Sequence, residues 1–482
     1  RKEANWNPKQ ELKFSGGSYD HKRMSLDTGY VLNDKVAFRM NGLYEHSRSH
    51  RKGQETQRYG ISPTVTIKPT NKTKIVIHAE LFKDDRTADR GIPSKNGRPW
   101  KGGNKKSRDT FFGSAALSPT DTNKKAISMH IDHRFNDNFK VRNRTHYSKF
   151  DKFYQNIYAN SAVSSNNQVT LGGYNDQTDR ENFFNQSDLL FNLNTGPIKH
   201  NIITGLEVSR QVTKQVRKKA VFGSSKVVNA FDPTYRGSLT FQDYALADGK
   251  SNHSISTSAV GVYIQDHMEL HPMVHITAGV RYDRFEQDAR NRHDDSMLKS
   301  RDDNISPRFG VILKPLETVS VYGSYSITHQ PRGGDQLKSL TLSNAALKPE
   351  KFTNMEAGVK VDVLDNLSFT TAFFQLDRTN MILTGAAAGD AVLGKGSRTR
   401  GVEVGLQGQL TDKWNILASY TYMKGTLSAN SNSNAGNTLK ETPKNMYAVW
   451  NRYDVTPWFG AAFGVVGRSA MFTKEDNTVT LP

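Results

Sequence analysis

Two stretches of the chain combine many positive charges with neighbouring aromatic residues. Residues 83–108 hold nine Lys or Arg against three Asp, and residues 214–226 hold five Lys or Arg and no acid. Clustered cations attract anionic ligands, and an aromatic face beside a cation can join the contact. These residues therefore indicate capture of an anion. For any single residue, the alternative interpretation is a solvated cation or one that touches a phosphate group.

Other motifs indicate less. His267, His271 and His275 are spaced by four, which on a helix would suggest a metal-binding face. These histidines span a strand, a turn and a strand, so the spacing predicts no convergent ligand set. Residues 102–107 (GGNKKS) superficially suggest a phosphate loop, but the required Gly before Lys is absent, and a basic loop is expected. Since the sequence has no credible Ser/His/Asp arrangement, it does not support an enzyme.

Composition narrows the class of protein. The chain has 482 residues, a net charge of +19 and no Cys, which excludes a disulfide scaffold, a zinc-cysteine protein, a thiol enzyme and an iron–sulfur protein. Hydrophobic residues make up only 35%, yet 10% of residues are aromatic, which argues against disorder. The sequence contains no run of 18 apolar residues, so it predicts no transmembrane helix. The length fits one domain only if that domain is a large closed or repeated β structure.

Apolar and polar residues alternate along many segments, and this period predicts β-strands with one apolar face. In the segment 402–410, Val402, Val404 and Leu406 are expected to face lipid. The residues expected to face a lumen are Glu403, Gln407 and Gln409. The alternating segments run for roughly ten residues, which is the length that a tilted strand needs to cross a bilayer.

Connections also alternate, between tight turns and long polar stretches. Residues 194–197 (NTGP) are typical of a tight turn, whereas 85–122, 150–177, 214–252 and 287–303 are expected to be loops. This asymmetry is typical of an outer-membrane barrel with short periplasmic turns and long extracellular loops. About 19 strands are predicted, beginning near Gln10, Lys22, Val36, Gln57, Lys74, Lys124, Phe139, Asp179, Lys199, Ser256, Val274, Ile305, Val319, Phe352, Leu367, Arg398, Trp414, Lys444 and Phe459.

The ordered set of short motifs resembles the barrel domain of TonB-dependent siderophore receptors, particularly the catecholate-siderophore branch. The segments that carry the resemblance are 84–87 (DDRT), 90–93 (RGIP), 306–310 (SPRFG), 322–326 (YGSYS), 347–358 (LKPEKFTNMEAG), 400–404 (RGVEV) and 442–445 (TPKN). Each motif is weak alone, but together they cover essentially the whole chain.

The resemblance implies an all-β fold, a transmembrane antiparallel up-and-down barrel of 22 strands in the bacterial outer membrane. A plug domain would fill it, and TonB would supply energy through that plug for import of a ferric siderophore. Iron would arrive as the siderophore complex, with no cofactor bound by the barrel itself. The other expected partners are outer-membrane lipid and lipopolysaccharide. We expect a monomer, no nucleic acid, and a receptor and transporter rather than an enzyme.

Cations and aromatic residues in the predicted extracellular segments are the candidate ligand contacts, because catechol rings could stack on aromatic side chains beside a cation. The candidates are Arg90, Arg98, Trp100, Phe111, Phe153, Tyr154, Tyr158, Tyr235, Tyr244, Gln330 and Arg332. A TonB-dependent transporter of cobalamin or a glycan is the nearest alternative. A passive porin is less favoured because porins have 16–18 strands. The dispersed cations disfavour a nucleic-acid binder.

Two further expectations concern the barrel wall. Tyr282, Tyr325, Trp414, Tyr420 and Tyr422 share the apolar parity near strand ends and are expected to form interfacial girdles. Residues 1–482 are expected to be one barrel domain that lacks the plug and about three final strands. The segment 10–18 should then have no continuous ladder with the segment 459–468, because an even strand number closes such a barrel.

Overall fold

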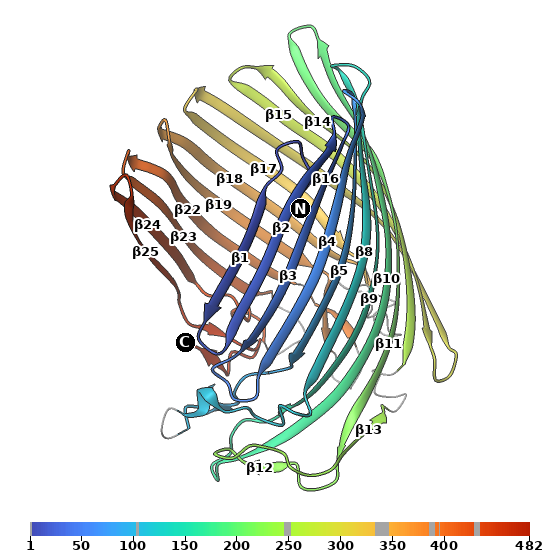
Figure 1. Ribbon diagram of the computed structural model, residues 1–482, viewed down its shortest axis with the longest axis vertical. Coiled ribbons are helices and arrows are strands. Elements are labelled where there is room, and N and C mark those ends of the chain that lie inside the picture. Colours follow the sequence, from blue (N-terminus) through green and yellow to red (C-terminus); the bar gives the residue numbers. More distant parts are fainter. Residues whose placement is uncertain are drawn as a thin grey trace.

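The computed structural model describes residues 2–102, 106–244, 252–332, 347–384, 391–394, 396–428 and 434–482, and its strands curve into one large antiparallel wall (Figure 1). The main sheet has 21 strands, of which β12 and β13 are short additions, so that 19 strands form the wall. Each wall strand pairs with its neighbour in chain order.

The wall strands are β1 (Gln10–Gly17), β2 (His21–Asn33), β3 (Val36–Arg48), β4 (Glu55–Thr70), β5 (Thr73–Thr87), β8 (Pro119–Arg134), β9 (Phe139–Ala159), β10 (Gln168–Thr195), β11 (Ile198–Phe222), β14 (His253–His271), β15 (Val274–Asn291), β16 (Met297–Leu316), β17 (Val319–Gln330), β18 (Glu350–Leu364), β19 (Leu367–Thr379), β22 (Ser397–Thr411), β23 (Trp414–Leu427), β24 (Asn445–Thr456) and β25 (Phe459–Arg468). The short elements are β6 (Ser94–Lys95), β7 (Arg98–Pro99), η1 (Lys106–Asp109), β12 (Val227–Asn229), β13 (Leu239–Asp243), β20 (Met381–Thr384), β21 (Ala391–Gly394), β26 (Met471–Phe472) and β27 (Thr480–Leu481).

The predicted strand parity is confirmed in β22. Val402 pairs with Phe373 of β19, whose ring is 62% exposed on the outer surface, and Val404 and Leu406 share that face. Glu403 pairs with Ala372 and shares the inner face with Glu356, which accepts a hydrogen bond from Tyr322 at 2.6 Å. Since successive strand residues point to opposite faces, Gln407 and Gln409 also lie on the lumen side.

Short turns and long connections occur at opposite ends of the wall, as the sequence predicts. The turn after β10 has Gly196 at a φ of 61°, a left-handed conformation that glycine adopts without a Cβ penalty. The long connections that hold β6, β7, β12 and β13 lie at the other end, at the bottom of Figure 1. By the expected asymmetry, that end is extracellular.

Several predicted loops are strands instead, which corrects the sequence interpretation. β9 continues to Ala159, β11 continues to Phe222, and β10 begins at Gln168 rather than near Asp179. Much of the predicted loops 150–177 and 214–252 is therefore extended wall. Outward-facing positions become charged at Lys149 and Glu181, where the strands leave the apolar band. Beyond that level both faces meet water, so the alternation that marks a strand is lost.

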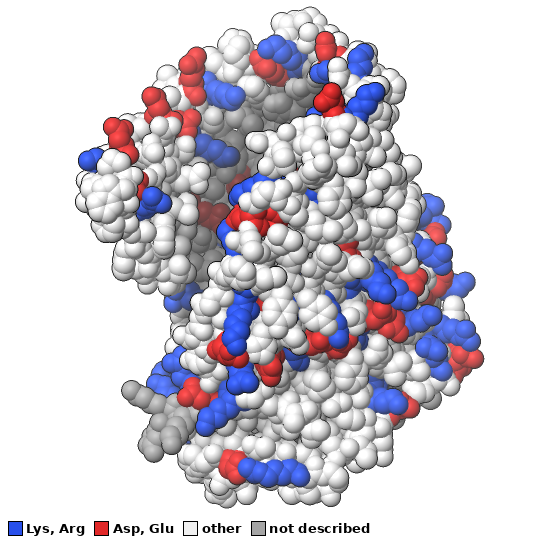
Figure 2. Space-filling view, in the orientation of Figure 1, with Lys and Arg blue, Asp and Glu red and all other residues white. Residues whose placement is uncertain are grey.

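The five predicted girdle residues all have outward parity. Tyr325, Trp414, Tyr420 and Tyr422 are exposed by 37–42%, and Tyr420 pairs across strands with Tyr447 of β24. Tyr282 is partly covered and donates a hydrogen bond to Asp303. Figure 2 shows an uncharged band over the front strands, with a row of Lys, Arg, Asp and Glu below it. Tyr and Trp side chains suit such a border, because the body of the ring is apolar and its polar tip can contact water.

Many charges on the lumen face are paired. Arg39 binds buried Asp27 through two hydrogen bonds of 2.7 Å, Arg142 lies 3.1 Å from buried Asp188, and Arg281 contacts both Asp283 and Glu207. A buried charge is costly to leave alone, and a partner removes most of that cost. Because so many charges on this face are paired, a cation there without a carboxylate partner is unusual and is a candidate for ligand binding.

The two edges of the wall remain separate within the described residues. β1 pairs with β2 and β25 pairs with β24, and no ladder joins β1 to β25. The two strands border the opening at the left of Figure 1. The absence of the plug and of about three final strands stays a prediction. No helix among the described residues has the length and hydropathy needed to cross a membrane.

Candidate functional site

The longest strands carry a pocket on the inner face of the wall, beyond the apolar band. Inward-facing positions follow one another along β9, β10 and β11, because side chains two residues apart share a face. Lys152 pairs with Thr178, and Tyr154 and Arg217 both pair with Asp176. The pocket is lined by Thr122, Phe150, Lys152, Tyr154, Tyr174, Asp176, Thr178, Arg180 and Arg217.

Guanidinium groups and tyrosine rings lie at the extracellular end of this pocket, where Arg90 and Tyr158 border its lining residues Tyr154 and Tyr174. The guanidinium carbon of Arg90 lies 4.1 Å from the ring centroid of Tyr158 and 5.0 Å from that of Tyr174. Its nitrogens donate to the hydroxyls of Tyr154, at 3.4 Å, and of Tyr174. The guanidinium carbon of Arg217 lies 3.9 Å from the Tyr174 ring. Cation–π contact fixes these groups without neutralising their charge.

The pocket and its border carry more positive charge than their one acid can offset. Its acid, Asp176, accepts a hydrogen bond from Gln215 at 2.5 Å and lies 3.4 Å from Arg217. Arg180 donates to the hydroxyl of Thr213 at 3.1 Å, and the Lys152 amine lies 5.7 Å from the Tyr154 ring centroid. In the described ranges, Arg90, Lys152 and Arg180 have no carboxylate within ion-pair distance.

Burial affects the protonation equilibria in this pocket. It raises the pKa of the Tyr154 hydroxyl, which therefore stays protonated and able to donate at neutral pH. Burial also lowers the pKa of Arg180, but an arginine remains charged under all physiological conditions. The pocket thus offers fixed cations, aromatic faces and a neutral phenol donor. This combination suits an anionic ligand with aromatic rings.

The structure brings together three of the predicted site residues, Arg90, Tyr154 and Tyr158. It separates the adjacent Phe153, whose parity is opposite to that of Tyr154, so its ring points away from the lumen. Arg98 lies exposed in the β6–β7 hairpin. Tyr244 is half-buried next to residues outside the described ranges.

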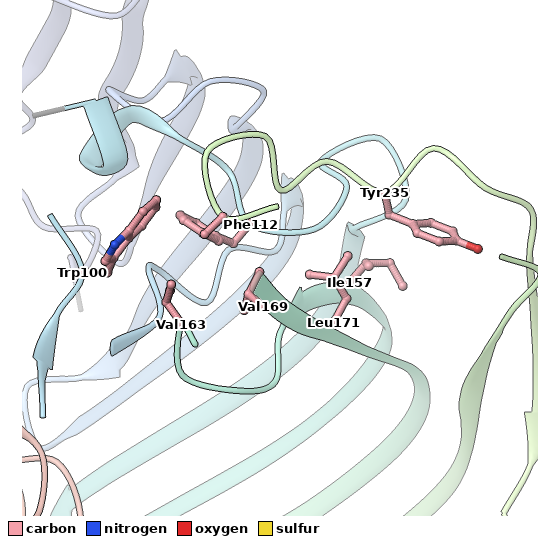
Figure 3. Close-up of a cluster of buried hydrophobic side chains, with 8 residues drawn as sticks. Trp100, Phe112, Ile157, Val163, Val169, Leu171 and Tyr235 are labelled. Atoms are coloured by element: carbon pink, nitrogen blue, oxygen red, sulfur yellow. The ribbon is translucent and has the colours of Figure 1, made fainter. Parts of the chain in front are cut away.

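Three predicted aromatic contacts are buried, and two of them, Trp100 and Tyr235, belong to one hydrophobic core outside the membrane. Trp100 is 7% exposed, Phe111 8% and Tyr235 4%. Figure 3 shows Trp100 and Tyr235 in one cluster of buried side chains that also includes Phe112 and Ile157. Trp100 packs edge-on against Phe112 at 5.8 Å between ring centroids. These enclosed rings hold the extracellular connections together and offer no open face to a ligand.

The predicted contacts at the end of β17 are also structural rather than open to a ligand. The Arg332 Nη2 lies 2.6 Å from Oδ1 of Asp302, whose side chain is only 2% exposed. Its Nη2 also donates to the main-chain carbonyl of Arg301. Gln330 ends β17 and is half-buried. Arg332 therefore neutralises a buried acid, as the other paired lumen arginines do.

Eight of the nine residues that line the pocket were not predicted as site residues, among them Phe150, Lys152, Tyr174, Arg180 and Arg217. Most of them lie in segments interpreted as loops, so their shared face was not considered. The available signal was the period of two in Tyr174, Asp176, Thr178 and Arg180 on β10. Only a strand running well beyond the membrane brings these four side chains to one face.

The histidine motif forms no metal site among the described residues. His267 and His275 do face each other, with ring centroids 5.4 Å apart. The four-residue spacing did not predict this contact, because it arises from the pairing of the neighbouring strands β14 and β15. Across the described parts of the chain, no group of three or more His, Cys, Asp or Glu could hold a metal ion. The glycine-rich segment 102–107 lies largely outside the described residues.

Replacing Trp100 by Ala should loosen the extracellular core. Truncation of a buried Trp to Ala costs about 3–5 kcal/mol, and limited proteolysis of the extracellular connections should accelerate accordingly. Phe231→Ala is the matched control, because that ring touches Trp100 at 5.2 Å yet is 60% exposed. Unchanged proteolysis of the Trp100→Ala protein, together with lost ligand binding, would return Trp100 to the ligand site.

Comparison with known proteins places this geometry in a family. The family described as "TonB dependent receptor-like, beta-barrel" matches residues 58–482. A probable TonB-dependent siderophore receptor of Acinetobacter baumannii, PiuA, is 25% identical over 98% of this chain and 69% of its own length. The metal-pseudopaline receptor CntO of Pseudomonas aeruginosa is 25% identical over 95% of this chain and 65% of its own length.

Solved structures agree with the fold. The crystal structure of PiuA covers the whole chain with a TM-score of 0.87 at 23% identity, and 74% of that receptor is matched. The closed form of the Escherichia coli ferric-catecholate import receptor Fiu covers 98% of the chain with a TM-score of 0.83 at 22% identity, and 72% of Fiu is matched. The chain is therefore an outer-membrane β-barrel that belongs to the TonB-dependent receptor family.

Proposed function

We propose that this chain forms the barrel of a receptor that binds a ferric siderophore of the catecholate type and imports it with energy from TonB. The observation that carries the proposal is a set of three uncompensated cations, of which Lys152 and Arg180 line the pocket and Arg90 borders it beside tyrosine rings. A ferric tricatecholate is trianionic and carries aromatic rings on its surface. Its charge can pair with these cations while its rings stack on the tyrosines.

The names of the relatives support a siderophore as the ligand more strongly than they support a catecholate in particular. PiuA is named as a siderophore receptor and Fiu as an import receptor for ferric catecholates, whereas CntO is named for metal–pseudopaline. A neutral cobalamin or glycan would leave the pocket cations without a counter-charge. The iron is cargo that arrives within the siderophore, and the receptor acts by binding and transport rather than by bond chemistry. Outer-membrane lipid and lipopolysaccharide would surround a monomeric barrel.

Growth of an iron-starved bacterium tests this function. A strain deleted for the receptor gene and complemented with it should grow on a purified ferric tricatecholate, and a strain that also lacks TonB should not. Growth on ferric catecholates that is equal without the receptor gene, or receptor-dependent rescue by cobalamin or a glycan alone, would contradict the proposal.

A further inference from the structure

A hydroxyl, an imidazole and a carboxylate lie in one line across three neighbouring strands, near the periplasmic end of the wall. Thr195 ends β10, His200 lies near the start of β11, and Asp266 lies on β14. The Thr195 Oγ1 is 2.7 Å from the His200 Nε2, and the His200 Nδ1 is 2.6 Å from the Asp266 Oδ2. This is the order of a nucleophile, a general base and an acid that orients the base.

Strand pairing brings these three side chains together, although their spacing in the sequence predicts no such site. His200 pairs with Leu193 of β10 and with Met268 of β14. Thr195 and Asp266 lie two residues from these partners, so each is a diagonal neighbour of His200 on the same face. This is the outer face, because Leu193 shares its parity and is 46% exposed there. The three side chains therefore belong to the rim around the turn that joins β10 to β11.

The hydrogen bonds set the roles of the two imidazole nitrogens. A carboxylate only accepts hydrogen bonds, so the His200 Nδ1 carries the ring proton and donates to Asp266. The Nε2 of the neutral ring then accepts a hydrogen bond from the Thr195 hydroxyl. His200 is therefore placed to take the hydroxyl proton when the Thr195 oxygen attacks a substrate.

The carboxylate of Asp266 acts on this imidazole rather than on a fixed cation. Among the described residues its one ion-pair partner is His200, and its Oδ1 is buried without a hydrogen-bond partner. The lumen carboxylates of Asp27 and Asp188 pair with arginines instead. A buried acid without a Lys or Arg partner is costly to keep. Stabilising the imidazolium that forms during proton transfer gives this acid a role.

The turn that follows Thr195 leaves room for a substrate. Gly196 has a φ of 61°, and a Cβ at this position would meet no atom within 4 Å. Within the described ranges, its main-chain N–H makes no hydrogen bond. The N–H of the residue after a nucleophile is a recurrent donor to the oxyanion that forms in acyl transfer. Because Thr195 and Gly196 are both exposed, water can also reach the site.

The geometry points to a further activity of this chain, the hydrolysis of small water-soluble carboxylic esters at the periplasmic end of the wall. The Thr195 oxygen bonds to the ester carbonyl carbon while its proton passes to the His200 Nε2. The bond from that carbon to the alcohol oxygen then breaks, and the alcohol leaves with the proton. Water, which gives a proton to His200, next attacks the threonyl ester. The carboxylic acid is released, and the proton returns to the Thr195 oxygen.

This site is separate from the proposed ligand pocket. It lies on the other face of the wall and at the opposite end of β10 and β11 from Tyr174 and Arg217. The inference therefore does not depend on the siderophore function.

Hydrolysis of p-nitrophenyl butyrate by the purified receptor in detergent tests this site. The receptor should release p-nitrophenol faster than detergent micelles alone. Thr195→Ala or His200→Gln should lower kcat/KM by at least about a hundredfold, the lower limit of what a positioned general base contributes. Thr195→Ser keeps a hydroxyl nucleophile and should retain hydrolysis. An alkyl fluorophosphonate should add to the Thr195 oxygen, which the mass of the peptide will show, and should not add in the His200→Gln protein. Retained mobility differences between heated and unheated samples on gels will show that each variant folds.

Thr73 and His133 provide a matched control at the same end of the wall. They are cross-strand partners of β5 and β8 with outward parity, and the Thr73 Oγ1 lies 2.8 Å from the His133 Nδ1. No carboxylate of the described residues lies within ion-pair distance of His133. Thr73→Ala should therefore leave the rate of hydrolysis unchanged.

Four results would overturn the inference. The first is a receptor that neither hydrolyses the ester nor forms the fluorophosphonate adduct. The second is unchanged hydrolysis in the Thr195→Ala protein, and the third is an equal loss in the Thr195→Ala and Thr73→Ala proteins. The fourth is release of fatty acid from a phospholipid in mixed micelles without hydrolysis of p-nitrophenyl butyrate, which would overturn the assignment to water-soluble esters.

Discussion

Glutamine in place of both Lys152 and Arg180 should weaken binding of a ferric tricatecholate by a hundredfold or more. Each removed charge-assisted contact contributes about 1.5–3 kcal/mol, and about 2.7 kcal/mol corresponds to a hundredfold change in Kd. Neither cation neutralises a carboxylate within the described structure. The fold should therefore survive the change. Titration of the purified receptor with the ferric tricatecholate, followed by tryptophan fluorescence, will measure the change in Kd.

Lys140→Gln is the matched control for this experiment. Lys140 lies on β9 with the same inward parity as Lys152, but near the periplasmic turn and 3.6 Å from Asp132. Its replacement should leave the affinity unchanged within about twofold. An unchanged affinity in the Lys152→Gln/Arg180→Gln protein would mean that the ligand does not use this pocket.

Replacing Val404 by Arg should destabilise the barrel by about 2–4 kcal/mol. Val404 lies on the outer face of β22 between Val402 and Leu406, so a guanidinium there would face hydrocarbon. A charged side chain near the bilayer midplane carries a cost of this size. Urea unfolding of the protein in phospholipid vesicles will measure the free energy of unfolding.

Gln407→Arg on the same strand provides the comparison. Gln407 has the opposite parity and faces the lumen, where a guanidinium group could stay in contact with water. Its replacement should change the free energy of unfolding by less than about 1 kcal/mol. Equal costs for the two substitutions would contradict the assignment of lipid and lumen faces.

The membrane-spanning wall was predictable because lipid imposes a strict pattern on it. Outward positions such as Val402 and Val404 must be apolar, while inward Glu403 meets water or polar partners, so the period of two is visible in the sequence. Turns such as residues 194–197 carry Gly and Pro for backbone reasons alone. These constraints are local, and eight of the predicted strand beginnings coincide with observed first residues, namely Gln10, Val36, Phe139, Val274, Val319, Leu367, Trp414 and Phe459.

The proposed ligand pocket was less predictable because outside the membrane that pattern disappears. Tyr174 lies on a part of β10 whose two faces both meet water, so the apolar–polar alternation is missing there and the segment was interpreted as a loop. Trp100 and Tyr235 appeared to be exposed aromatic contacts, yet they pack in a core formed by connections far apart in the sequence. Such long-range packing has no local signature, whereas Arg90, Tyr154 and Tyr158 were found by composition alone.

The most direct test of the central claim compares two ferric siderophores of similar size on the purified receptor. One is a trianionic tricatecholate and the other a neutral trihydroxamate, with affinities measured by fluorescence titration at low and high salt. The three uncompensated cations predict at least tenfold tighter binding of the tricatecholate and a loss of that preference as salt screens the charges. Equal affinities for both complexes, or a preference for the hydroxamate that salt does not change, would contradict the account.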